Sequence, residues 1–455
     1  MNYLKKYLTL FSVIVFLGFA QKSFTQTFVG AQIDNRAGIR GLTLNPANVI
    51  NPRLKSELNV FTISSYIGND YIGLNLSDIS KLNSFIEILS IDDVSGLGDI
   101  NAKPDNNFVG NADILGPSFQ INLSDKHSIA LSTRFRTFFT LNNFGGELLE
   151  AIYDEEKEVQ EFQLLMRDVN GITHAWGELG GTYGRVLMEN KLLLLKGAAT
   201  FKYLFGAGGI SVSSGTLGAI YRENTDTLTT VGQLDYGFTE SVENGEIEFG
   251  TFNSGFGVDL GIIIEIKDKR NRAYNDGYLF RGGISVLDLG GINYKGFSEK
   301  DYNMNARISF DEFDEKSLEE VLDDNYQGTK DIREQTLAMP TSLQVYGDVA
   351  LTNKMYISAH TSISLRDHEE IPVSKITNNI TLTPRFESGW IAVYSPLSYR
   401  QYEEGLSWGV GVRMGPVILG SGSILTNILS KRSRSTDLYF GLQIPIYRKG
   451  QKVES

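Results

Sequence analysis

Residues 255–266 read GFGVDLGIIIEI, and their chemistry changes at every second position. The even positions, from Phe256 to Ile266, are all apolar, whereas the odd positions include three glycines, Asp259 and Glu265. Successive side chains of a β-strand point to opposite faces of the sheet. This period of two therefore predicts a strand with one apolar face.

The same alternation recurs along the chain. It is clear in residues 129–139, 343–351, 355–365, 406–414 and 438–446. Weaker segments, among them 192–205 and 208–220, bring the total to about 14 to 16 predicted strands. Length alone suggests two or three domains for 455 residues, but many-stranded barrels often fold as one large unit. The sequence therefore predicts an all-β chain.

The composition supports this prediction and excludes several chemistries. Glycine accounts for 47 of the 455 residues, which is about one in ten against roughly 7% in an average chain. Glycine lets strands curve and lets backbones approach closely. The chain contains no cysteine, which excludes disulfides, thiolate metal sites and thiol nucleophiles.

A soluble, secreted β-sandwich also alternates, so other features must distinguish it from a membrane barrel. The predicted strands reach the roughly 9 to 11 residues that a tilted strand needs to cross a bilayer. Aromatic residues gather near segment ends, as at Tyr203, Tyr278 and Trp390, where interfacial girdles are expected. These features favour a transmembrane antiparallel β-barrel.

The face opposite the apolar one would line the lumen. It mixes small polar residues with charges, and the candidates for lumen-lining residues are Arg134, Arg136, Asp259, Glu265, Asp348, His360 and Arg413. Two interpretations remain open. The charges line a permeation path, or they pair with one another across a filled barrel, because an unpaired buried charge is costly.

The N-terminus has the pattern of an export signal. Lys5 and Lys6 precede an apolar run that is too short to span a bilayer, so residues 1–20 are expected to be a cleaved signal peptide, with 1–25 as the alternative. The rest, residues 21–455, is expected to form one barrel domain in the cell outer membrane, in contact with its lipid.

Residues 37–48 read AGIRGLTLNPAN and interrupt the alternation. Pro46 fixes its own φ angle and disfavours helix at Asn45, so a compact non-strand structure is expected. This glycine-rich segment ending in Asn-Pro-Ala resembles the N-terminal segment of FadL-type outer-membrane fatty-acid transporters and of PorV-like barrels of Bacteroidota. The resemblance implies a plug-like segment over residues 28–55, with Arg40, Gly41, Asn45 and Pro46 as hatch candidates.

The C-terminal runs GVRMGPVILGSG (411–422) and DLYFGL (437–442) are similar to an uncharacterised family of Bacteroidota outer-membrane proteins. That resemblance spans the mature chain and implies a FadL-like barrel with short helical insertions. It implies no settled biochemical activity. The last strand is expected to end near Tyr447.

The net charge of −12 comes from two segments. Residues 145–168 hold eight acidic and two basic residues, and residues 311–333 hold nine acidic and three basic residues, so each segment contributes −6. Apolar residues at helical spacing predict acidic helical insertions in both. They are either solvated faces of docked helices or a surface for an envelope protein partner. A Ca²⁺ site is the weakest alternative, because the spacing of a Ca²⁺ loop is absent.

The sequence lacks the structural context that catalytic motifs require. Residues 405–409 match G-x-S-x-G, but the following residues continue a strand and no histidine comes later in the chain. The histidines show no metal-ligand spacing, and no basic stripe suits nucleic acid. We therefore expect no enzyme, no cofactor, no metal and no nucleic-acid partner.

Two functions remain. The first is a barrel, FadL-like, that binds or passes a small hydrophobic ligand past its plug. The alternative is a non-transporting barrel that scaffolds or anchors a cell-envelope complex. An apolar pocket beside the plug would favour the first, and a lumen closed by ion pairs would favour the second.

Overall fold

The computed structural model describes residues 28–73, 100–148, 161–243, 246–247, 253–267, 277–312, 316, 318–366, 373–403, 405–430 and 432–447. The expected signal peptide, the tail after Tyr447 and residues 149–160, half of the first acidic segment, lie outside these residues. All statements below concern the described part of the chain.

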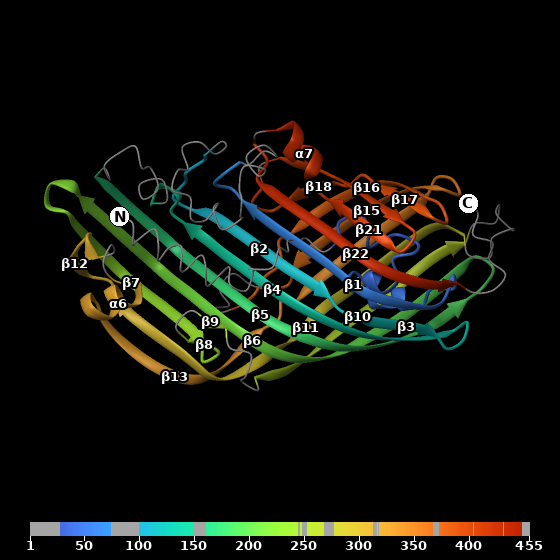
Figure 1. Ribbon diagram of the computed structural model, residues 1–455, viewed down its shortest axis with the longest axis horizontal. Coiled ribbons are helices and arrows are strands. Elements are labelled where there is room, and N and C mark those ends of the chain that lie inside the picture. Colours follow the sequence, from blue (N-terminus) through green and yellow to red (C-terminus); the bar gives the residue numbers. More distant parts are fainter. Residues whose placement is uncertain are drawn as a thin grey trace.

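The strands close into one antiparallel barrel, because β1 (Leu54–Asn69) pairs with β22 (Ser435–Tyr447) at the other end of the chain. Some positions around the barrel are occupied by two successive segments that share their neighbours, as with β2 (Asn106–Leu115) and β3 (Ser118–Asn122). Counted this way, the barrel has 14 strands, as expected from the sequence. Figure 1 shows the strands running diagonally along the molecule.

The remaining elements follow in chain order. They are β4 (His127–Phe144), β5 (Phe162–Glu189), β6 (Leu193–Arg222), η3 (Glu223–Thr225), β7 (Thr227–Thr239), β8 (Val242–Glu243), β9 (Glu246–Ile247), β10 (Ser254–Lys267), β11 (Tyr278–Asn303), β12 (Ala306–Ser309), α6 (Leu318–Asn325), β13 (Gln327–Ala338), β14 (Ser342–Ala350), β15 (Met355–Ser364), β16 (Asn379–Glu387), β17 (Ile391–Tyr394), β18 (Leu397–Arg400), β19 (Leu406–Trp408), β20 (Val410–Met414), β21 (Val417–Ser421) and α7 (Ile424–Leu429).

The outside of the barrel carries an apolar belt. On β10 the even residues Leu260, Ile262 and Ile264 are exposed, whereas the odd residues Asp259 and Glu265 are buried. Exposed large apolar side chains recur on strands all around the barrel. Water would disfavour so large a continuous apolar surface, so the belt faces lipid and the barrel is of the outer-membrane type. The structure therefore confirms that the period of two marks strands with one apolar, outward face.

The prediction of an aromatic girdle is wrong for one residue. Tyr203 and Trp390 are exposed, as expected, but Tyr278 is buried inside the barrel and donates a hydrogen bond to Asp348. Its hydroxyl finds a charged partner there, which an outward position would not provide. No described helix is both long and apolar enough to cross a membrane.

Part of each acidic segment belongs to a strand. In the first, residues 162–168 belong to β5, because Leu164 and Met166 point inward and Leu165 points outward, as in a strand. In the second, α6 is present, but residues 327–333 belong to β13. Lys55 and Leu54 likewise belong to β1, so the segment before the barrel wall ends at Arg53.

Several strands continue far beyond the belt. β5 and β6 have 28 and 30 residues, against the roughly 9 to 11 that cross a bilayer. β6 is one strand where the sequence predicted two. Residues 162–170 of β5 and 210–222 of β6 form a sheet with β7, β12, residues 297–303 of β11 and residues 327–333 of β13. We call this sheet the extension; it is seen at the left of Figure 1.

The helix α6 packs on the inner face of the extension. Its Val321 and Leu322 join an apolar cluster with residues of the sheet, including Tyr302. Lys300 and Tyr302 also donate hydrogen bonds to Asp323, at 2.9 and 2.5 Å. Burial raises the pKa of Asp323, but these hydrogen bonds outweigh it and hold that pKa below its ordinary value.

Candidate functional site: the plug and the lumen

The chain enters the barrel before β1 as a short segment, residues 28–53, that we call the plug. It contains two 3₁₀ helices, η1 (Gly38–Thr43) and η2 (Pro46–Val49). Asn45 caps η2, since its side chain accepts a hydrogen bond from the backbone N–H of Ala47, and Pro46 occupies the first helical position, where its lack of an N–H costs nothing. The local sequence thus explains the compact fold of this segment.

The hatch candidates fix the plug to the wall. Asn45 Nδ2 donates to the carbonyl oxygens of Ile262 and Ile284, at 3.1 and 3.0 Å. Arg40 is fully buried, and its Nη1 donates to Gln443 Oε1 at 2.9 Å. Gly41 accepts a hydrogen bond from Asn48, so it acts within the plug.

Glycines of the wall make room for η2. A Cβ atom built on Gly261 would lie 2.1 Å from Asn45 Oδ1 and 2.8 Å from Pro46 Cδ. A Cβ atom on Gly184 would lie 2.4 Å from Val49. Both glycines face the lumen in an alternating strand, and that position in the sequence was the available sign of a close backbone approach.

Ion pairs hold the other end of the plug. Arg413 Nε lies 2.7 Å from Asp34 Oδ2, and Tyr394 donates to the same carboxylate. Glu57 accepts from the backbone N–H of Ile39 at 2.8 Å. The sequence identified Arg413, but it did not identify Asp34 and Tyr394 as its neighbours, nor Glu57 as a contact of the plug.

A second set of ion pairs joins residues of the wall strands β6, β10, β11, β14 and β16. Arg385 contacts both oxygens of Asp348 at 2.7 Å, and Arg281 Nη2 lies 3.1 Å from the same carboxylate. Nearby, Lys196 Nζ lies 2.6 Å from Glu265 Oε1. Asp348 and Glu265 are thus both paired.

A third set lies further along the lumen. Arg136 Nη1 lies 2.8 Å from Asp288 and 3.1 Å from Glu178. Lys202 Nζ lies 2.6 Å from Asp288 and 2.8 Å from Asp259. Arg134 pairs with Asp113 on β2. All of these side chains are buried or nearly so, so each charge depends on its partners.

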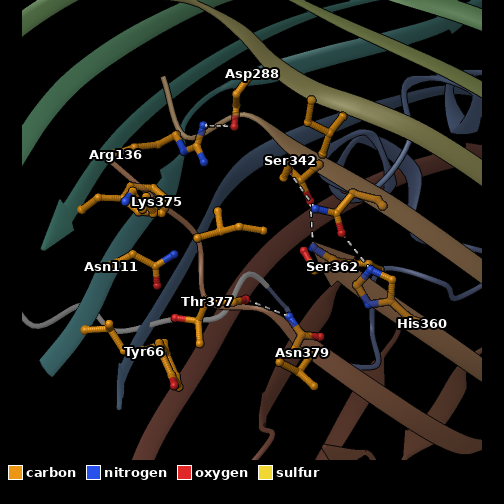
Figure 2. Close-up of a pocket in the computed structure, with 18 of the residues that line it drawn as sticks. Tyr66, Asn111, Arg136, Asp288, Ser342, His360, Ser362, Lys375, Thr377 and Asn379 are labelled. Carbon is orange, nitrogen blue, oxygen red and sulfur yellow. Dashed lines mark hydrogen bonds and ion pairs between the residues drawn. The ribbon is translucent and has the colours of Figure 1, made fainter. Parts of the chain in front are cut away.

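A cavity of about 100 Å³ lies beside this third set. Plug residues, among them Gly30 and Gln32, line it, and so do residues 375–377 of the segment before β16, which we call the inner loop. Figure 2 shows Arg136, Asn111 and His360 around this space, with Thr377 between them. Among the described residues, Arg136 Nε and Asn111 Oδ1 have no hydrogen-bond partner.

The lumen candidates thus divide into two groups. Arg134, Arg136, Asp259 and His360 line the cavity, where His360 Nε2 lies 2.9 Å from Gln344 Oε1. Glu265, Asp348 and Arg413 lie in the ion pairs around the plug. Within the described ranges, no group of three or more acidic or histidine side chains is arranged to hold a metal ion.

Comparisons with solved structures return matches of low sequence identity. They include the toluene transporter TodX of Pseudomonas putida (8% identity, TM-score 0.45, 90% of this chain and 95% of that chain). A FadL homologue of Pseudomonas aeruginosa gives 8% identity and a TM-score of 0.43 over 93% and 98%. The toluene transporter TbuX of Ralstonia pickettii gives 8% and 0.42 over 94% and 100%.

A search of curated proteins gave no match. A family model matches residues 46–422, from η2 to the end of β21, and therefore most of the barrel. The chain belongs to that family, which is described as a family of unknown function (DUF5723).

Proposed function

We propose that this protein is an outer-membrane barrel that binds a small ligand in its lumen and passes it when the plug moves. The observation that carries the proposal is the cavity between plug and inner loop, whose lining residues Arg136 and Asn111 each have one buried polar atom, Nε and Oδ1, without a hydrogen-bond partner. Such groups are costly unless something binds them, so they suit a guest molecule.

The lining suggests the chemistry of the ligand. Val109, Phe138, Leu287 and Ile376 offer apolar contacts, which suit the small hydrophobic ligand expected from the sequence. The charged groups on the same wall would be desolvated by a purely apolar molecule. The cavity therefore fits an amphipathic molecule with an apolar part and a polar or charged end.

The connections of the barrel suggest its orientation. Short turns, at residues 123–126, 190–192, 351–354, 388–390 and 415–416, lie at the same end as the start of β1. Most of the longer connections lie at the opposite end, although the connection from Lys267 of β10 to Tyr278 of β11 lies at the same end as the short turns. Outer-membrane barrels have short turns in the periplasm and long loops outside the cell. The plug is thus on the periplasmic side and the extension on the cell surface.

Uptake into proteoliposomes tests this function. L-phenylalanine is a suitable amphipathic probe, and arabinose is an uncharged probe without an apolar ring. We expect saturable phenylalanine uptake by the intact protein, and fast uptake of both probes by a variant lacking residues 30–50. Asn111→Leu, which fills the cavity with an apolar group, should abolish phenylalanine uptake by the intact protein.

The controls concern folding. The Asn111→Leu variant should keep the heat-modifiable gel mobility of a folded barrel, since Asn111 makes none of the ion pairs described above. The shortened variant is compared only where it shows the same mobility. Absence of uptake by both the intact protein and the shortened variant would contradict passage. Unchanged uptake by Asn111→Leu would remove the cavity from the path.

A second function is favoured by the ion pairs that close the lumen around Asp34, Asp348 and Asp288. In that case the barrel is a fixed anchor for an envelope complex. The helix α7 would contribute to its docking surface, because Ile428 and Leu429 are 54% and 71% exposed. Absence of uptake through any variant, with a folded barrel, is the result expected for an anchor.

A further inference from the structure

The extension projects beyond the lipid-facing belt. On the outer face of β11, the apolar residues Ile284 and Leu289 are followed by Glu299 and Asp301. Asp301 lies opposite Asp235 on β7 in the strand register. So many carboxylates do not face hydrocarbon, so this part of the sheet stands in water, where a protein partner can reach it.

One edge of the extension is open. β13 pairs with β11 on one side, and no other described strand pairs with its residues 327–337 on the other. The side chains of residues 327–334 are exposed, so neither face of this stretch is covered. An open edge presents a row of backbone N–H and C=O groups that can pair with another strand.

The side chains along this edge have an unusual order. Residues 330–334 read Lys-Asp-Ile-Arg-Glu, with Ile332 at the centre. Ile332 is 64% exposed, although it lies outside the membrane belt. Charged residues alone would protect an edge against pairing, but an exposed isoleucine at the centre does the opposite.

We propose that β13 pairs antiparallel with β13 of a second copy of this chain, centred on Ile332. In that register Lys330 lies opposite Glu334 of the other copy, and Asp331 lies opposite its Arg333. Each pair then occurs twice around the two-fold axis, and Ile332 meets its own counterpart. Cross-strand pairs of opposite charge stabilise a sheet, whereas like charges destabilise it.

The charges are available for this contact. Lys330 and Glu334 alternate with Asp331 and Arg333, so the two sets lie on opposite faces of the strand. Arg333 contacts Glu299 of its own chain at 2.6 Å, but this pair is partly exposed and can be shared with an incoming carboxylate. The complementarity therefore extends over both faces, which fits a second copy better than an unrelated strand.

The pairing also fixes how the two barrels face. β13 continues into β14, which is part of the barrel wall, and wall strands tilt by about 35–45° from the barrel axis. Antiparallel pairing reverses the strand direction, so the two barrels point in opposite directions. This arrangement suits copies in two facing membranes, with the extensions meeting between them.

A cysteine cross-link tests the register. The chain has no native cysteine, so Ile332→Cys provides a single probe in the full-length protein. Directly opposed Cβ atoms lie about 4.5–5.5 Å apart, which a disulfide can bridge with small adjustment. In detergent, where each barrel rotates freely, mild oxidation should give a covalent dimer. Thr329→Cys mixed with Gln335→Cys should give a mixed dimer more efficiently than either variant alone.

The control is Lys354→Cys, an exposed position at the opposite end of the barrel. Equal dimer yields from Lys354→Cys and Ile332→Cys would show random collision and overturn the proposal. A mixed dimer that forms no better than the dimers of Thr329→Cys alone and of Gln335→Cys alone would overturn the register.

Exchanging charges tests the charge complementarity of the two strands, with the yield of the Ile332→Cys disulfide dimer as the measurement. In the Ile332→Cys background, Lys330→Glu places carboxylates opposite each other twice and should lower the dimer yield about tenfold. Adding Glu334→Lys restores opposite charges and should restore the yield. These side chains are exposed, so folding is unaffected. If the dimer yield of the Lys330→Glu/Glu334→Lys variant stays as low as that of Lys330→Glu alone, the pairing is contradicted.

Discussion

Replacing Gly261 with alanine is expected to open the barrel. The new Cβ atom would lie 2.1 Å from Asn45 Oδ1 and 2.8 Å from Pro46 Cδ, so either the plug or the wall must move. The wall at β10 is held by ladders to both β6 and β11, whereas η2 is a single short turn. The plug should therefore be displaced, and Asn45 should lose its hydrogen bonds to Ile262 and Ile284.

Overpacking of this kind costs about 1–3 kcal/mol, which corresponds to roughly a 5- to 150-fold increase in the population with a displaced plug. Single-channel recording in planar bilayers measures that population directly. The matched control is Gly257→Ala, on the same lumenal row of β10, where a Cβ atom meets only ordinary contacts at 3.5 Å. Equal open probabilities for the two variants would show that η2 does not close the barrel.

Replacing Asp348 with alanine should cause the largest loss of stability. Its carboxylate accepts from Arg385 at two positions and from Arg281, and all three side chains are buried. Without this carboxylate, both buried guanidinium groups lose a partner of opposite charge, which a buried charge needs. Breaking a buried pair in this way costs about 3–5 kcal/mol. Unfolding by urea, followed by tryptophan fluorescence in micelles, should show this loss.

Two comparisons separate charge from packing. Glu299→Ala breaks the partly exposed pair with Arg333, and it should cost no more than about 1 kcal/mol. Arg385 also pairs with Glu387, so the triple variant Asp348→Leu/Arg385→Met/Glu387→Gln removes the buried charges that depend on one another, while Arg281 keeps its hydrogen bonds to Asn35 and Ile33. It should recover part of the lost stability. If Glu299→Ala and Asp348→Ala lower the free energy of unfolding by similar amounts, burial of the ion pair does not determine its contribution to stability.

The sequence predicted the barrel and its inward charges because lipid imposes a strict rule. Every second residue of a spanning strand must be apolar, so parity alone places Asp259 and Glu265 inside. The same rule does not apply beyond the membrane. In residues 162–168 both faces of β5 lie outside the belt, and their loose apolar spacing resembled a helix.

The partners of the inward charges could not be predicted, because they depend on register. Asp288 binds both Arg136 and Lys202, yet parity alone does not identify it. A bulge between β10 and β11 shifts the alternation at this point, where Asp288 adopts a φ of 60° and its N–H donates to Asp259. A one-residue shift of this kind exchanges the two faces of a strand, and the sequence gives no clear sign of it.

The pairing of β1 with β22 also sets an order of assembly. The seam of the barrel joins residues near the two ends of the chain, so it can form only after the last strand has been delivered to the membrane. The plug precedes β1 and sits inside the finished wall. It is synthesised before any strand of the wall, so it is available to pack between the strands while the seam is still open.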